Sequence, residues 1–149
     1  MLCLTGGSLA AQSGGDADLT GQLALSRAQL QVERQAIITR AMEFTDGESN
    51  TFWPLYREYQ GKLEEVIDRQ VALLRDYAAS YDTLTDKQSE DLVKRYQDSQ
   101  KDKLKVQQDY FKKFKKILPP RKVARYFQLE NKLDAIVAYD LARTVPLVR

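Results

Sequence analysis

Apolar side chains recur at three- and four-residue steps through most of this chain, and that spacing constrains its fold more than any other feature. The clearest stretch begins after Ser49, which is predicted to cap a helix that continues to Ser80. Pro54 is compatible with this helix because the backbone donors of the first turns have no partner in any case. The stripe has one polar interruption, at Gln70, and consists of Phe52, Leu55, Tyr56, Tyr59, Leu63, Val66, Leu73 and Tyr77.

A second long stripe follows after a short turn. Thr85 and Gln88 form a capping-box pattern, which predicts the start of a helix that reaches Leu118. The middle of that helix, from Gln97 to Lys103, is wholly polar, so it is expected either to be a solvent-exposed span or to face a water-filled groove. The stripe consists of Leu92, Val93, Tyr96, Leu104, Gln107, Phe111, Phe114 and Leu118.

Two further helices are predicted on either side of this pair. The first runs from Ser26 to about Thr45, and the Asp-Gly pair that follows supplies its stop. Two consecutive prolines follow Leu118, and the second of them suits the first position of a helix that ends before Pro146.

The chain is therefore predicted to be all-α, with four helices of which the two central ones are long and antiparallel, as in a helical hairpin or bundle. With 149 residues it can build one core, so residues 19–149 are assigned to a single helical domain. No stretch approaches the roughly 20 apolar residues that a membrane-spanning helix requires.

Histidine is absent from the chain and cysteine occurs once. These counts remove the commonest metal ligands, the commonest general base and any intramolecular disulfide, so neither a metal site nor a cofactor site is predicted. Glu130 and Asp134 lie one helical turn apart and could act as a pair of catalytic carboxylates, but the neighbouring cations make ordinary ion pairing the preferred interpretation. The protein is therefore expected not to be an enzyme.

The first 18 residues differ in composition from the rest. Ser8-Leu9-Ala10 ends a short apolar segment and fits the small-x-small rule of a signal-peptide cleavage site. Because no basic residues precede that segment, it is predicted to be a truncated signal peptide whose start lies upstream of Met1, followed by a flexible leader. Export from the cytoplasm is expected, against the alternative of a merely flexible N-terminus. Cleavage after Ala10 would remove Cys3.

A Leu-Thr-x-x-Gln sequence begins at Leu84, at the turn between the two long helices, and taken alone it is an ordinary helix start. Thirty-four residues later a Leu-Pro-Pro sequence occupies the same kind of place before the next helix, and it is interpreted as a diverged second copy. The motif residues are Leu84, Thr85, Gln88, Leu118, Pro119 and Pro120. On these residues the chain, from about residue 49 to 142, resembles the Spy and CpxP group of bacterial periplasmic stress proteins, whose signature is a Leu-Thr-x-x-Gln motif at the turns between long helices.

The resemblance implies a function as well as a fold. Members of this group are all-helical hairpins, often cradle-shaped dimers, and act in the bacterial envelope as ATP-independent chaperones or stress-response accessories. It therefore implies a periplasmic protein that forms a homodimer, binds other proteins and needs no cofactor. Metal-responsive relatives use histidines, which this chain lacks.

Charge is distributed unevenly along the chain. Residues 94–125 contain 12 Lys or Arg against three Asp, a net charge of +9, and since the whole chain carries +2 the remainder carries −7. A basic stripe attracts acidic protein segments, anionic lipid headgroups or nucleic acid, whereas the alternative is a solvated helix face that only keeps the protein soluble. Export argues against nucleic acid and leaves proteins as the main partners, with weak contact to an anionic membrane surface. The candidate partner-binding residues are Lys101, Lys105, Lys112, Lys115, Lys116, Arg121 and Arg125.

Aromatic residues accompany both stripes. Tyr110, Phe111 and Phe114 could stack on nucleic-acid bases, but they lie on an apolar stripe and are assigned to the core. The tyrosine-rich stripe after Ser49, together with Trp53, could bind client proteins, but packed core is again the preferred interpretation. Any part of it that four helices leave uncovered would favour dimerisation.

The preferred functional hypothesis is a periplasmic helical binding protein that acts as an ATP-independent chaperone or an envelope-stress accessory. The alternative is a structural or regulatory helical protein that binds one specific partner, such as a sensor or an anti-sigma-like component. A cytosolic nucleic-acid-binding protein is a third hypothesis, and it requires that the N-terminal segment is not an export signal.

Overall fold

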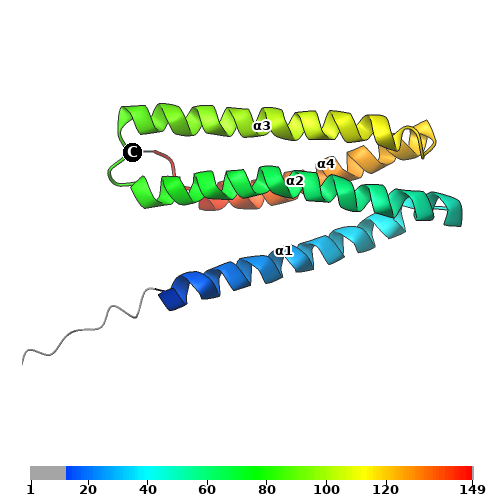
Figure 1. Cartoon of the computed structure of the whole chain (residues 1–149), viewed down its shortest axis with the longest axis horizontal. Coiled ribbons are helices and arrows are strands. Elements are labelled where there is room, and N and C mark those ends of the chain that lie inside the picture. The colour runs from blue at the N-terminus through cyan, green and yellow to red at the C-terminus, as the bar shows by residue number, and fades with distance from the viewer. Residues whose placement is uncertain (1–12, 149) are drawn as a thin grey trace, which may run out of the picture. The chain divides into compact units, whose positions relative to one another are not determined.

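The computed structural model describes the backbone of residues 13–148 and the side chains of residues 28–148. Within this part of the chain there are four helices and no strand: α1 (Ser13–Met42), α2 (Asp46–Ser80), α3 (Asp86–Phe114) and α4 (Pro120–Thr144) (Figure 1). The prediction of an all-α fold with two long central helices is confirmed. The predicted signal peptide and its cleavage site, within residues 1–12, lie outside the described residues.

The chain divides into two units, Met1–Ala41 and Met42–Arg149, and each is described by itself. Among the described residues, no helix has the length and apolar character needed to span a membrane.

In the first unit, α1 begins at Ser13, well before the predicted start at Ser26. The flexible leader predicted before residue 19 is therefore helical from Ser13 onward. Adjacent glycines in this segment cost a helix only about 1 kcal/mol each relative to alanine, so they weaken a helix without ending it. Leu19 and Leu23 continue the helical spacing of apolar residues toward this earlier start.

The second unit begins where α1 ends. The helix stops at Met42, and Glu43 has a left-handed backbone with φ of 47°, the only positive φ at a non-glycine residue within the described chain. The predicted stop at Asp46-Gly47 is therefore wrong. Both residues belong to the first turn of α2, where an acidic side chain is stabilised by the positive end of the helix dipole.

The N-cap of α2 is Thr45, not Ser49 as the apolar pattern predicted. The Thr45 hydroxyl accepts the backbone N–H of Glu48 at 3.3 Å, and the Glu48 carboxylate accepts the backbone N–H of Thr45 at 3.0 Å. These reciprocal bonds satisfy two donors that would otherwise have no partner, which explains why the helix begins here.

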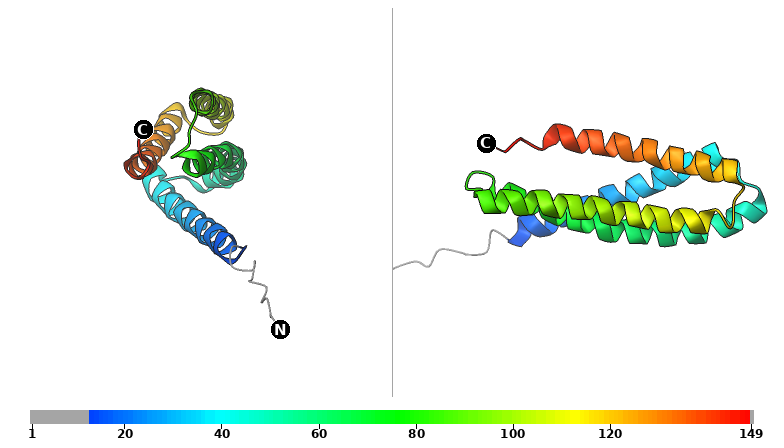
Figure 2. Two further views of the ribbon diagram at one scale, coloured as in Figure 1. Left: turned by 90° about the vertical axis from the view of Figure 1, so that its left-hand side faces the viewer. Right: turned by 90° about the horizontal axis from the view of Figure 1, so that it is seen from above.

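α2 and α3 pack against each other as an antiparallel hairpin, and α4 returns along it (Figures 1 and 2). α2 contains 35 residues and is therefore about 52 Å long. α3 ends at Phe114, before the predicted end at Leu118, because the chain tightens there into turns in which the Lys116 N–H bonds to the Lys113 carbonyl, three residues back. The backbone N–H groups of Ile117 and Leu118 both bond to the Phe114 carbonyl, at 3.1 and 3.0 Å. Pro119 is the N-cap of α4 and Pro120 is its first residue, as predicted.

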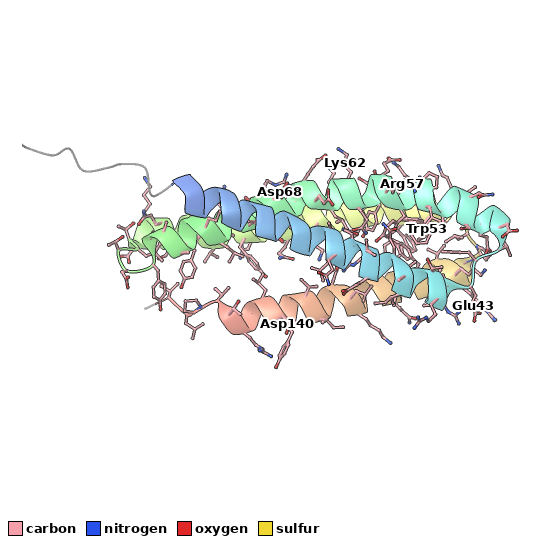
Figure 3. All side chains as sticks on the ribbon, turned by 90° about the horizontal axis from the view of Figure 1, so that it is seen from below. Glu43, Trp53, Arg57, Lys62, Asp68 and Asp140 are labelled. Carbon is pink, nitrogen blue, oxygen red and sulfur yellow. The ribbon has the colours of Figure 1, made fainter. Side chains whose placement is uncertain are left out.

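Aromatic rings form the core at the end of the hairpin where α4 begins. The ring centroid of Phe52 lies 5.4 Å from that of Phe114 and 5.0 Å from that of Tyr126, so α2, α3 and α4 each contribute a ring. Side chains crowd around Trp53 and are sparse near Asp140, close to the far end of α4 (Figure 3). The core prediction for the tyrosine-rich stripe is confirmed here, where the fully buried rings are Phe52, Tyr56, Tyr59, Phe114 and Tyr126.

A polar layer interrupts the packing of α2 against α3. Ser99 is 5% exposed, and its hydroxyl donates to the Tyr96 carbonyl at 2.7 Å and accepts the side-chain amide of Gln70 at 3.2 Å. The polar stretch from Gln97 to Lys103 is therefore not wholly exposed, since it places one small hydroxyl inside the interface. The interruption that the sequence shows at Gln70 has its partner in this layer.

Candidate functional site

The cations of residues 94–125 separate into two groups. One group joins helices through ion pairs: Arg95 with Asp76 at 2.7 Å, Lys113 with Glu58 at 2.7 Å, Lys103 with Asp134 at 2.8 Å, and Lys122 with Glu48. These side chains hold elements of the fold together, so part of the basic stripe seen in the sequence has a structural role.

The second group contains the predicted partner-binding cations. Lys101 and Lys112 pair only with aspartates three residues away in α3, at 3.5 and 3.6 Å, and their side chains stay 76% and 74% exposed. Exposed pairs of this kind contribute little and are screened by salt. Lys105, Lys116 and Arg121 form no ion pair with any described residue. We call this exposed set the basic face; its members are Lys101, Lys105, Lys112, Lys115, Lys116, Arg121 and Arg125.

Helix geometry gathers much of the basic face on one side of α3. Lys101, Lys105 and Lys112 are separated by steps of four and seven residues, which are close to whole turns of an α-helix. Lys115 follows in the connection to α4, where its ammonium lies 5.5 Å from the ring centroid of Phe111. The positive charge therefore continues from the outer side of α3 into the connection.

An exposed apolar flank accompanies the basic face. Val93, Tyr96, Leu104 and Phe111 are 57%, 55%, 53% and 40% exposed, and their spacing places them along one side of α3. The core prediction for Phe111 is thus wrong in part, because 40% of this residue stays exposed although its ring centroid lies 5.2 Å from that of Phe127. The apolar stripe of α3 is wider than the area that α2 and α4 cover. We call these four residues the apolar flank.

The motif residues lie at the two ends of α3. The backbone N–H of Thr85 donates to the Gln88 side chain at 2.9 Å and that of Gln88 to the Thr85 hydroxyl at 3.2 Å, so the predicted capping box is confirmed. Leu84 is half-buried beside it. At the other end, Leu118 is buried just before Pro119 and Pro120. Since the 29 residues of α3 span about 43 Å, the two motif copies do not form one site.

Lys122 has a role that the sequence did not predict. Its ammonium donates to the carboxylate of Glu48 and, at 3.0 Å, to the carbonyl of Glu43, so it ties the first turn of α4 to the start of α2. The hydrogen bond from Lys122 is the main cause that lowers the pKa of Glu48, and the backbone N–H of Thr45 adds to it. The Thr-x-x-Glu pattern at Thr45 was the signal available in the sequence.

Glu58 forms a similar link between α2 and α3. Its Oε1 accepts the Tyr110 hydroxyl and the Lys113 ammonium, each at 2.7 Å. The bond from Lys113 is the largest cause that lowers the pKa of Glu58, and the same bond raises the pKa of Lys113. Burial raises the pKa of Tyr110, so its phenol remains a hydrogen-bond donor. Tyr110 is a core residue, as predicted, with its polar tip satisfied by a carboxylate.

The carboxylates considered for catalysis have separate environments. Glu130 is 2% exposed, whereas Asp134 is bonded to Lys103 across α3 and α4. The ion-pairing interpretation is thus supported for Asp134, whose carboxylate lies 2.8 Å from the Lys103 ammonium. In the part of the chain that the structure describes, no three His, Cys, Asp or Glu side chains gather in a way that could hold a metal ion.

Comparisons of the chain with protein-family models, with curated proteins and with solved structures found no match. Function is therefore inferred from the basic face and the apolar flank. The similarity to the Spy and CpxP group stays a prediction that depends on the motif residues of α3.

Proposed function

We propose that this protein is an exported helical binding protein of the bacterial envelope that holds non-native proteins without ATP and without a cofactor. The observation that supports this function is that two exposed lysines, Lys105 on α3 and Lys116 in the connection that follows it, form no ion pair with any described residue and accompany the half-exposed side chains of the apolar flank. The envelope location depends on the export signal expected from the first residues of the sequence.

Each part of this surface has a physical role in binding. Exposed lysines attract acidic segments over a distance of about 10 Å at moderate salt, and this attraction raises the rate of encounter. The apolar flank then contacts the hydrophobic side chains that a non-native protein exposes. Neither contact requires a defined partner sequence, so the combination tolerates many partners.

The expected affinity is low. Leu104 and Tyr96 are already about half covered, so each gains only part of the roughly 1.5–3 kcal/mol that full burial of a large apolar side chain provides. A weak and reversible contact suits a protein that delays aggregation and then releases its client unchanged. Formation of a homodimer, which the resemblance implies, would double the number of such contacts, and sedimentation of the purified chain measures it.

An aggregation assay tests the proposal. The chain is mixed at substoichiometric to equimolar ratio with an unrelated, chemically denatured protein, in low and in moderate salt and without ATP. We expect it to suppress light scattering, and to do so less well as salt increases because exposed charges are screened. Absence of suppression in both buffers would contradict the proposal and favour the alternative of one dedicated partner bound at fixed stoichiometry.

A matched pair of variants tests whether the basic face takes part. Lys105→Gln with Lys116→Gln removes two positive charges from the basic face, whereas Lys87→Gln with Lys132→Gln removes two exposed charges elsewhere. We expect the first pair to reduce suppression and its salt dependence, and the second pair to change neither. Equal loss in both pairs would show that only net charge matters, as for a solvated helix face.

A further inference from the structure

The segment that follows α4 is held by two tyrosines. α4 ends at Thr144, and Val145 has extended backbone angles, φ −84° and ψ 118°. The Tyr77 hydroxyl donates to the Pro146 carbonyl at 2.9 Å, and the Tyr81 hydroxyl donates to the Leu147 carbonyl at 3.1 Å. Both tyrosines come from the end of α2, next to the turn into α3. Two adjacent carbonyls of one extended segment thus each accept a tyrosine hydroxyl.

The tyrosine hydroxyls hold the backbone of this segment, where Val145 is half-buried and the next three side chains are exposed. Leu147 is 89% exposed and Val148 is 58% exposed. The rings of Tyr77 and Tyr81 lie edge to face, with centroids 5.6 Å apart, which fixes the two hydroxyls relative to each other. Burial raises the pKa of Tyr77, so its hydroxyl stays protonated as a donor. These two hydrogen bonds therefore involve only the main chain of the segment.

We propose that Tyr77 and Tyr81 form a binding site for the main chain of extended peptide segments, and that residues 145–148 occupy this site until such a segment from another protein displaces them. As a binding site for non-native segments this inference rests on the proposed function. The ligand class is an extended segment that contains proline, because proline favours the extended conformation in which successive carbonyls are free to accept.

This site has a different physical basis from the basic face. Carbonyl groups are common to every sequence, so recognition through them requires only an extended conformation, such as proline favours, whereas the basic face selects acidic segments. Hydrogen bonds between neutral groups are also insensitive to salt, unlike attraction by exposed lysines. Residues 145–148 are linked covalently to α4, so their high effective concentration keeps the site occupied in the absence of a competitor.

A peptide supplied in trans tests the site. A variant that ends at Thr144 lacks residues 145–149. A fluorescent peptide of residues 142–149 serves as the probe. Its binding is followed by fluorescence polarisation in low and in moderate salt. We expect the peptide to bind the shortened chain at least about tenfold more tightly than the full chain, because residues 145–148 of the full chain compete for the site. Tyr77→Phe with Tyr81→Phe in the shortened chain is expected to weaken binding about tenfold, the effect of two modest hydrogen bonds.

Tyr139→Phe is the matched control, because this exposed tyrosine lies outside both proposed binding surfaces and its hydroxyl has no hydrogen bond within the described residues. It should leave peptide binding unchanged. Equal binding to the full and the shortened chain, or binding that the double phenylalanine variant does not weaken, would overturn the inference. So would loss of binding in moderate salt.

A second measurement uses the full chain and does not depend on the shortened variant. Trypsin cleavage after Arg143 requires the end of α4 to open, so it should be several-fold faster in the double phenylalanine variant than in Tyr139→Phe, which keeps the ring near Arg143. Equal cleavage rates would also overturn the inference. The aggregation assay separates this result from the proposed function: suppression without peptide binding leaves the chaperone and removes this site, whereas peptide binding without suppression leaves the site and removes the chaperone.

Discussion

The two ends of the α2–α3 hairpin are built in different ways. At the aromatic end, where α4 begins, Phe52, Phe114 and Tyr126 are fully buried against one another. Toward the turn end, where α2 leads into α3, ion pairs such as Arg95 with Asp76 join the helices. Among the described residues, the far half of α4 contributes no ring to a cluster of this kind. The aromatic end holds three helices together, while the turn end depends on polar contacts that water can replace.

The two proposed binding surfaces differ in the same way, because the site proposed at Tyr77 and Tyr81 lies toward the turn end, whereas most of the basic face lies at the aromatic end. Regions with few buried apolar contacts and many exposed hydrogen bonds open at lower cost than a packed core. The less packed part of the hairpin contains the contacts of residues 145–148 with Tyr77 and Tyr81. It also contains the exposed apolar residues Val93 and Tyr96. A protein that binds by local opening can thus remain folded through its aromatic end.

The largest expected effect is the loss of a ring from the aromatic end. Phe114→Ala leaves a cavity among α2, α3 and α4 and should reduce the free energy of unfolding by about 3–5 kcal/mol, the usual cost for a buried phenylalanine. Val93→Ala, on the apolar flank toward the turn end of α3, should cost less than about 1 kcal/mol. Urea unfolding followed by circular dichroism measures both. Similar losses in the two variants would show that the two regions are equally important for stability.

The polar layer between α2 and α3 provides a second test. Ser99→Ala alone removes the acceptor of the Gln70 amide and should cost about 1 kcal/mol. Gln70→Leu with Ser99→Ala replaces both partners by apolar groups and should restore stability or raise it by about 1 kcal/mol. A double-mutant cycle in urea measures the coupling. If the double variant is less stable than either single variant, the polar layer contributes to stability and the two ends of the hairpin differ less in stability.

The two capping boxes compare the ends directly. Thr85→Ala at the turn end should cost about 1 kcal/mol. Thr45→Ala should cost more, because its box includes the Glu48 carboxylate that Lys122 also binds. Ser49→Ala, within the first turns of α2, is the control and should change stability by less than about 0.5 kcal/mol. The measurement is the midpoint of urea unfolding, and an equal loss at Thr45 and Thr85 would argue against an additional contribution from Lys122.

Much of the fold was accessible from the sequence because it depends on local signals. The apolar spacing predicted all four helices, and Thr85 with Gln88 predicted the start of α3 to the residue. The start of α2 was missed because an Asp-Gly pair was interpreted as a stop, although Thr45 and Glu48 form the stronger local pattern. Helix boundaries are decided by caps more than by the first apolar residue.

The candidate site was less accessible, because it depends on which helices face each other. Composition predicted a basic stripe but could not separate Lys113, which bonds Glu58 on α2, from Lys112, which stays on the surface. The two lysines are consecutive in α3 and therefore point in different directions, and only Lys113 points toward Glu58 on α2. The hydrogen bond from Tyr77 to the Pro146 carbonyl could not be predicted from the sequence either, since no local pattern links residues 69 positions apart.

The smallest expected effect is a pH dependence confined to the aromatic end. Hydrogen bonds, first of all from Lys122, lower the pKa of Glu48 below its ordinary value of 4.5, so the unfolded state binds more protons as the pH falls past that value. The contribution of Glu48 is therefore complete above its ordinary pKa and is lost as the pH falls through the lowered pKa. Lys122→Gln removes the main cause and should flatten the loss of unfolding free energy between about pH 6 and about pH 3, whereas Lys132→Gln should not. Parallel curves of unfolding free energy against pH for the two variants would show that the bond between Glu48 and Lys122 does not stabilise the contact of α4 with the start of α2.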